Sequence, residues 1–290
     1  MPLHVYPWLL LVTFSLSARA QDLAFPIRSE FSWEKMEKKV SSAQVEQFIH
    51  GTPTEFENFK RPSKYNSLNL DSLPSRLHFL DINGDGLLDV IFDGESGGEV
   101  RLIDIFVNLG TGYKKTFSGL QSVKKMDWRD GRLYRLYLYD WGCCADYLNI
   151  DKIYQLTNDK PNSPRFVQMY QATFVNATVF PEATLEKPFR FEVLNDKYNI
   201  RFAPAVDDTS EQLWTSDAKD GVHGNVIGRL AKGARGTVLN KRTDTSGREW
   251  WFVEVDEEFY PTGNVLLKEE QNDFPTKVVG WISSRFAKII

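Results

Sequence analysis

From Leu77 onward, apolar and polar residues alternate with a period of two, and clusters of Asp, Asn and Gly interrupt the alternation at short intervals. This pattern is typical of half-buried β-strands joined by turns, and it limits the possible folds more than any other feature of the chain. Asp130 and Gly131, between two such runs, predict a tight hairpin. The predicted strands are residues 77–81, 87–92, 99–107, 113–117, 120–127, 132–140, 152–157 and 165–175. We therefore expect a mainly β protein.

The predicted strands form two similar units. Residues 77–81, followed by an Asp- and Gly-rich loop, are similar to residues 136–140, followed by the loop 141–146. A second and a third strand come after each loop, which is the pattern of an internal repeat. The sequence therefore predicts two blade-like antiparallel sheets.

A helix is predicted ahead of the strands, over residues 32–50. Apolar residues recur there at helical spacing, and Gly51 ends the pattern. Ser41 and Gln44 have the spacing of a capping box, which would restart the helix after a break. We expect this N-terminal helix to pack on a sheet.

Composition excludes several classes of protein. The chain has 290 residues, of which 42% are hydrophobic and 13% aromatic, too many for a disordered protein. Its net charge of −4 lacks the basic footprint of a nucleic-acid-binding protein, so no nucleic-acid partner is expected. With four histidines and two cysteines, the chain has little catalytic equipment, and we predict no catalytic residue.

The first residues resemble a secretion signal. Residues 8–16 are an apolar run, and Ala18 and Ala20 place small side chains before Gln21, as at a signal-peptidase site. The run is too short to cross a hydrocarbon layer of ~30 Å. We therefore predict a signal peptide over residues 1–20, a secreted or periplasmic mature protein, and no membrane span.

The most specific chemistry lies in residues 81–89. Asp81, Asn83 and Asp85 alternate along this segment, the carbonyl of Leu87 could point back toward them, and Asp89 closes the set. Oxygen ligands in a flexible arrangement suit Ca²⁺ better than Mg²⁺ and make Zn²⁺ a poor candidate. The sequence therefore predicts a calcium site at these five residues. The alternative is an Asx-rich turn without metal.

The surroundings of this loop indicate which kind of calcium site it is. An EF-hand needs a glutamate at the twelfth position, which is Phe92 here, and flanking helices where this chain has predicted strands. Residues 79–92 and 106–113 resemble an FG-GAP/VCBS-type calcium-binding repeat, covering about 77–117, with a degenerate second copy at about 133–175. The resemblance implies β-propeller-like blades with calcium in this loop. Propellers need at least four blades, so a complete one does not fit here.

Cys143 and Cys144 are adjacent in the loop of the second unit. In an oxidising compartment they could form a vicinal disulfide, stay as two thiols, or form intermolecular bridges. Neither a zinc site nor a redox motif fits, since neither four ligands nor a C-x-x-C spacing is present. We favour the vicinal disulfide, which would stiffen this loop in place of a metal.

The C-terminal part reads as a separate module. Residues 189–205 predict one more hairpin, and residues 225–230, 232–239, 250–255 and 280–286 are short strands separated by turns, the layout of a small barrel. Their motifs, V-I-G-x-L, K-G-x-x-x-T-V-L, W-x-x-V and G-W-I-x-S-x-F, resemble a bacterial SH3-like domain over about 207–290. Residues 256–277 depart from that pattern as an acidic insertion. The predicted domains are therefore 21–205, β-rich with its helix, and 207–290, SH3-like.

The SH3-like resemblance implies a binding module for cell-wall peptides or protein segments. Trp214, Trp250 and Tyr260 are then candidates for a ligand groove, although Trp250 or Trp251 could instead fill the core. Since alternate residues of a strand face opposite ways, Trp250 and Trp251 cannot be buried on the same face.

We expect a secreted, calcium-binding, non-enzymatic protein of adhesion type, whose partner is an unknown protein, peptidoglycan or glycan ligand. The alternatives are a secreted hydrolase with an SH3-like targeting domain and a carbohydrate-binding protein that presents Tyr and Trp side chains. No pair of acids and no base–nucleophile pair has the sequence context that a hydrolase would need.

Overall fold

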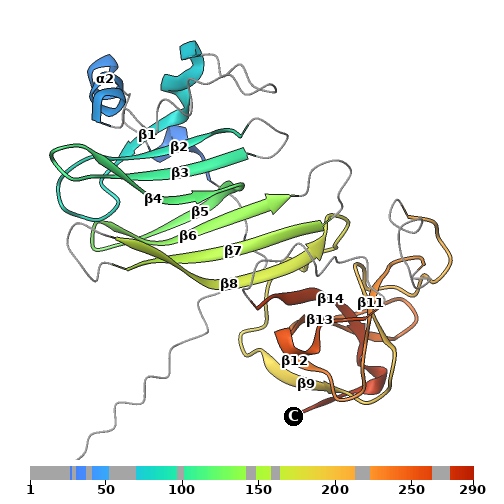
Figure 1. The fold of residues 1–290 in the computed structure, drawn as a ribbon. Coiled ribbons are helices and arrows are strands. Elements are labelled where there is room, and N and C mark those ends of the chain that lie inside the picture. Colours follow the sequence, from blue (N-terminus) through green and yellow to red (C-terminus); the bar gives the residue numbers. More distant parts are fainter. Residues whose placement is uncertain are drawn as a thin grey trace, which may run out of the picture.

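The computed structural model describes residues 27, 31–36, 41–51, 70–96, 101–141, 148–157, 164–212, 223–262 and 275–290. The protein is mainly β, with antiparallel sheets and few helices, as the alternation predicts (Figure 1). The proposed signal peptide, Cys143, Cys144 and Trp214 lie outside the described residues. None of the helices in the described ranges has the length and apolar character to cross a membrane.

The first sheet has four antiparallel strands in the order β1-β2-β3-β4. Each coincides with a predicted strand to within three residues at either end. Their bounds are β1 Leu77–Leu80, β2 Asp89–Glu95, β3 Arg101–Asn108 and β4 Tyr113–Gly119. The 3-10 helix η2, Leu70–Arg76, leads directly into β1. The candidate calcium loop is thus the connection between β1 and β2.

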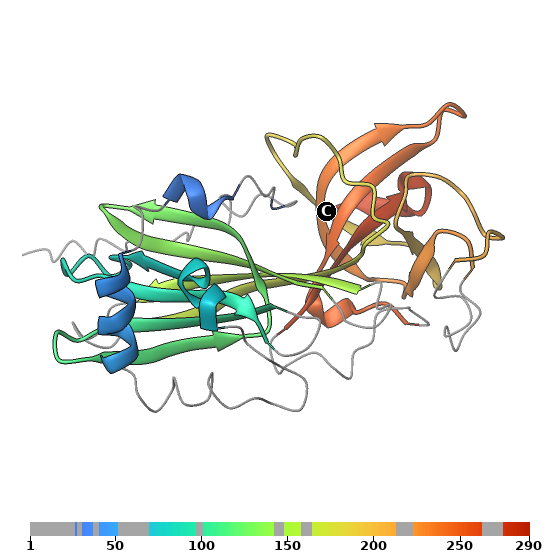
Figure 2. The same ribbon diagram turned by 90° about the horizontal axis from the view of Figure 1, so that it is seen from above.

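Two helices lie in the range where a helix with a restart at Ser41 is predicted. They are α1, Trp33–Met36, and α2, Ser42–Gly51. The capping box is confirmed at the start of α2, because Gln44 N donates to Ser41 Oγ over 3.3 Å and Ser41 N donates to Gln44 Oε1 over 2.9 Å. Helix α2 lies on the outer face of the first sheet (Figure 2), where Phe48 packs in one cluster with side chains of β1, β2 and β3.

A second antiparallel meander follows, in the order β5-β6-β7-β8. The predicted hairpin is confirmed, since Asp130 and Gly131 have φ of 51° and 75° between β5 and β6. The two meanders share one core cluster of apolar side chains. It includes Ile103 and Ile105 from the first and Leu136 and Leu138 from the second. The strand bounds are β5 Ser122–Arg129, β6 Arg132–Trp141, β7 Leu148–Thr157 and β8 Arg165–Val175.

The C-terminal strands curl around on themselves (Figure 1). Their core cluster includes Trp251 and Val253 and also takes in Leu148 of β7 and Val175 of β8. The C-terminal strands pair in the order β15-β9-β12-β13-β14, and β10 pairs with β11 and, at Arg201, with β14. Pairing among the described residues does not close these strands into a barrel. The bounds are β9 Phe189–Val193, β10 Tyr198–Arg201, β11 Val226–Leu230, β12 Arg235–Thr243, β13 Glu249–Val255, β14 Lys277–Ser283 and β15 Ala287–Ile289, with the 3-10 helices η3 Glu257–Phe259 and η4 Ser284–Phe286.

The hairpin predicted over residues 189–205 is wrong. Strand β9 pairs with β12 and β15, while β10 pairs with β11 and β14, so β9 and β10 do not pair with each other. The chain does turn between them, with Lys197 at a φ of 54°. However, Phe191, Val193 and Ile200 are buried in the core of the C-terminal strands, and this burial decides the pairing.

The N-terminal and C-terminal parts meet in a continuous sheet. Strand β14 pairs in parallel with β8 at two positions, which joins the second meander to the C-terminal strands as one 11-stranded sheet. An aromatic cluster spans this junction, with Phe174 from β8 packed among Trp250, Phe252 and Trp281. Tyr170 donates a hydrogen bond to Glu254 over 2.6 Å, and Lys277 pairs with the same carboxylate. The junction is therefore tightly packed.

His78 in β1 is a buried base stacked on Trp33, with ring centroids 3.7 Å apart. Burial is the main reason that the pKa of His78 is lowered to about 4. The charge of Asp93 raises this pKa, and the charge of Arg101 lowers it further. The folded state therefore prefers neutral His78, and stability should fall as the pH drops from 6.5 toward 4. We expect a loss of about 2–3 kcal/mol between pH 7 and 4.5 that His78→Phe does not show, measured by urea unfolding. Equal losses in both proteins would contradict this prediction.

Candidate functional site

The loop between β1 and β2 is built around the carboxylate of Asp81. Its Oδ1 accepts hydrogen bonds from the backbone N–H of Gly84 over 2.7 Å and of Asp85 over 3.1 Å, and its Oδ2 accepts one from Gly86 over 2.9 Å. Gly84 and Gly86 have φ of 78° and 86°, a backbone region that side chains disfavour. The glycines of the predicted motif are thus needed for the turn.

Asn83 and Asp85 continue this internal network. Asp85 N donates to Asn83 Oδ1 over 3.0 Å, and Asn83 Nδ2 donates to Asp85 Oδ2 over 2.9 Å. The N–H of Leu87 donates to Asp85 Oδ1 over 2.8 Å. Asn83 is buried whereas Asp85 is exposed. The loop therefore holds its own oxygen-bearing side chains together at the protein surface.

Asp89, the last residue of the predicted set, is fully buried. Its Oδ2 accepts the N–H of Ile82 over 2.9 Å and its Oδ1 accepts the N–H of Asn108 over 2.8 Å. Burial raises the pKa of Asp89 to about 7, the two N–H donors oppose this shift, and the charges of Asp85 and Asp81 add to it. This carboxylate therefore ties the start of the loop to β3.

Asn108 belongs to this site, although the sequence reasoning did not place it there. Besides its backbone bond to Asp89, its Nδ2 donates to the carbonyl of Leu88 over 3.1 Å. Its Oδ1 accepts the N–H of Gly110 over 2.9 Å. The sequence signal for this residue is the Asn-x-Gly spacing at the end of β3, within the second half of the repeat motif.

The donor chemistry of the loop fits a hard cation. Among the described residues, no lysine or arginine forms an ion pair with Asp81, Asp85 or Asp89, so their charges have no cationic partner there. The same part of the chain holds no ready-made cluster of three His, Cys, Asp or Glu side chains. Each carboxylate oxygen has two lone pairs, so an oxygen that accepts one N–H, such as Oδ2 of Asp81 or either oxygen of Asp89, keeps one lone pair for a metal. Oδ1 of Asp81 accepts two N–H groups and keeps none.

The structure separates the candidate groove aromatics of the C-terminal part. Trp250 is 1% exposed and packs at the junction with β8, while Trp251 is 4% exposed and packs in the core on the other face of β13. Tyr260 is half-buried against the same core as Trp251. Trp250 and Tyr260 therefore do not form one groove.

A pocket that the sequence did not predict lies beside Trp250. It brings together basic side chains from three separate segments, with Arg201 in β10, Arg248 just before β13 and Arg285 in η4. No local pattern marks these residues, because only the folding of β10 onto the later strands gathers them.

Comparison of the chain with models of protein families, with curated proteins and with solved structures gives no match. The resemblances to FG-GAP/VCBS-type repeats and to SH3-like domains therefore stay predictions from the motifs.

Proposed function

We propose that the protein is a secreted, calcium-binding, non-enzymatic binding protein of adhesion type. In this proposal the β1–β2 loop holds the cation and the C-terminal SH3-like module takes a cell-wall or protein ligand. The observation that carries it is the loop itself, where Asp81 and Asp85, with Asp89 at the start of β2, form no ion pair with a lysine or arginine of the described residues.

Asp81, Asn83, Asp85, the carbonyl of Leu87 and Asp89 are the residues that would hold Ca²⁺. The cation would neutralise carboxylates that otherwise repel one another, as the effect of Asp81 and Asp85 on Asp89 illustrates. Because Asp89 ties the loop to β3, neutralisation would also stabilise the first sheet. The calcium site would thus have a structural role.

The C-terminal module is the proposed ligand-binding part. Its support is the SH3-like motif pattern and the pocket beside Trp250, which is open to a ligand. The partner is proposed to be peptidoglycan, another glycan or a protein segment. A co-sedimentation screen with the full chain and insoluble peptidoglycan tests the cell-wall partner directly.

Calorimetric titration of the full chain with Ca²⁺ should give saturable heats, and Asp85→Ala should weaken binding at least about tenfold. Asp85 would supply a carboxylate ligand to the cation, and because its side chain is exposed, its removal should not disturb the core. The chelator-treated protein is used for both titrations.

Glu186→Ala is the matched control, since Glu186 is an exposed acid outside the loop. It should leave the calcium heats unchanged. Equal heats for the unaltered protein and Asp85→Ala would refute the metal site in this loop.

A further inference from the structure

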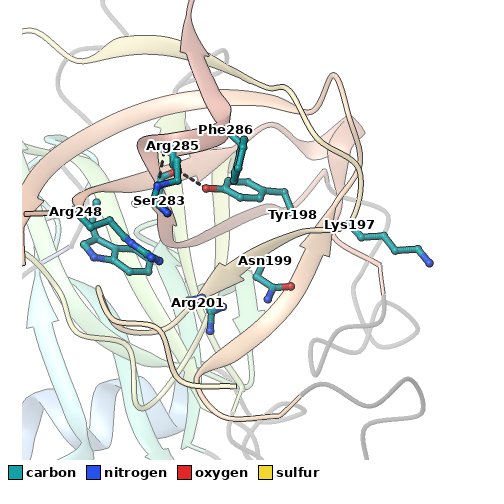
Figure 3. Close-up of a pocket in the computed structure, with 9 residues that line it drawn as sticks. Lys197, Tyr198, Asn199, Arg201, Arg248, Ser283, Arg285 and Phe286 are labelled. Atoms are coloured by element: carbon teal, nitrogen blue, oxygen red, sulfur yellow. Dashed lines mark hydrogen bonds between the residues drawn. The ribbon is translucent and has the colours of Figure 1, made fainter. Parts of the chain in front are cut away.

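The pocket of about 250 Å³ beside Trp250 has a strongly basic lining. Figure 3 shows Arg201, Arg248 and Tyr198 around it, with Lys197 extending away from the group. Arg285 and Phe286 of η4 complete one side. None of the described residues that line the pocket is acidic.

The positive charges of this pocket are only partly compensated. Arg201 is buried, and its guanidinium donates to the carbonyl of Asp207 and to Asn225 Oδ1 and pairs with Asp208 over 2.7 Å. Among the described residues, no carboxylate forms an ion pair with Arg248 or Arg285. Two guanidinium groups thus have no ion pair there, while the nearby carboxylate of Asp244 accepts the backbone N–H of Arg248 and the Nε1–H of Trp250.

Several basic side chains elsewhere in the same module are paired. Arg190 pairs with Asp256, and Arg235 and Lys288 both pair with Glu192. The pocket differs in that two arginines without an ion pair line one cavity, and a guanidinium binds a carboxylate through two parallel hydrogen bonds.

The aromatic residues that line the pocket indicate which chemical group of a ligand would lie next to its anionic group. The Arg248 guanidinium lies 5.6 Å from the centroid of the Trp250 ring, which holds it beside an aromatic surface. Phe286 is 43% exposed, and Tyr198 is fixed by donating to the carbonyl of Ser283 over 2.6 Å. An apolar side chain next to the anion would pack on these rings.

The size of the pocket indicates which part of a ligand it would hold. Its volume of about 250 Å³ is more than a bare ion fills. A terminal amino acid matches this space, with its carboxylate at the arginines and its side chain at the rings.

We propose that this pocket binds the free C-terminal carboxylate of a peptide, held by Arg248 and Arg285 and packed against Phe286. The inference rests on the proposed function, because it takes the C-terminal module as the ligand-binding part and names its ligand class.

The test is a calorimetric titration of the full chain with N-acetyl-alanyl-alanine, at constant ionic strength. The dipeptide with its free carboxylate should bind saturably, and its C-terminal amide should bind at least about tenfold more weakly, because it lacks the charge that the arginines pair with. Glucuronate and inorganic phosphate are the other probes. Binding of the amide, glucuronate or phosphate as tight as that of the dipeptide, or no saturable binding, would overturn the proposal.

Arg248→Gln and Arg285→Gln should each weaken dipeptide binding about tenfold. Arg242→Gln is the matched control, since Arg242 is an exposed arginine of β12 that does not line the pocket. Arg285 is exposed, so its variant should keep the fold even where Arg248→Gln loses it. Unchanged affinity in Arg285→Gln would overturn the placement of the carboxylate.

Calcium titration and peptidoglycan co-sedimentation of the same preparation separate this inference from the proposed function. Calcium heats and co-sedimentation without dipeptide binding would refute the pocket alone. Dipeptide binding without calcium heats would refute the calcium site alone.

Discussion

A fragment of residues 207–290, the predicted SH3-like domain, should fail to fold at 25 °C. It lacks β9 and β10, whose side chains Phe191, Val193 and Ile200 are at most 1% exposed in the core of the C-terminal strands. Burial of each is worth about 1.5–3 kcal/mol, so their loss removes about 5–9 kcal/mol. This is as large as the whole stability of a typical domain, about 5–15 kcal/mol. Circular dichroism and amide NMR dispersion measure the result.

The matched control is a fragment of residues 176–290, which begins after β8 and keeps both strands. It should show a cooperative thermal transition, at a lower temperature than the full chain because the faces of Trp250 and Trp281 lose their cover from β8. A cooperative transition in the shorter fragment would instead support a domain boundary near residue 206 and contradict the structural role of β9 and β10.

The strands of the two meanders could be predicted because their signals are local. Alternation marks each strand, and Asp130 and Gly131 fix the β5–β6 turn through backbone angles that their residue types favour. Consecutive strands then pair with each other, so nearest neighbours in sequence are neighbours in the sheet. The same reasoning failed for β9 and β10, because the partner residues in β12 and β11 lie 25 or more positions later in the chain.

The candidate calcium loop and the basic pocket also differ in how far their residues lie apart in the sequence. The loop 81–89 is one continuous segment, so the oxygen-bearing residues could be identified from spacing alone. The part of that site that the sequence reasoning missed, Asn108, reaches the loop from β3. The basic pocket could not be predicted from the sequence, because Arg201 and Arg285 are far apart in the chain and come together only after folding. The parallel pairing of β8 with β14 is equally non-local.

Asp89→Ala should destabilise the protein by about 2–4 kcal/mol in the absence of calcium. The substitution leaves the buried N–H groups of Ile82 and Asn108 without their acceptor, and each such loss costs about 1–3 kcal/mol. Part of this cost is offset, because the substitution also removes the carboxylate whose burial disfavours its charged form and raises its pKa to about 7. Urea unfolding in a chelating buffer at pH 7 measures the change.

Asp85→Ala provides the comparison, since it removes an exposed carboxylate from the same loop. In chelating buffer it should cost less than about 1 kcal/mol, as substitutions at exposed positions usually do. With saturating Ca²⁺ both variants should fall short of the stability that the unaltered protein gains, because each has lost a proposed ligand. Equal stability of Asp89→Ala and Asp85→Ala without calcium would contradict this prediction. It would mean that the hydrogen bonds from Ile82 and Asn108 to Asp89 do not hold the loop on β3, and that Asp89 acts in this loop through the cation alone.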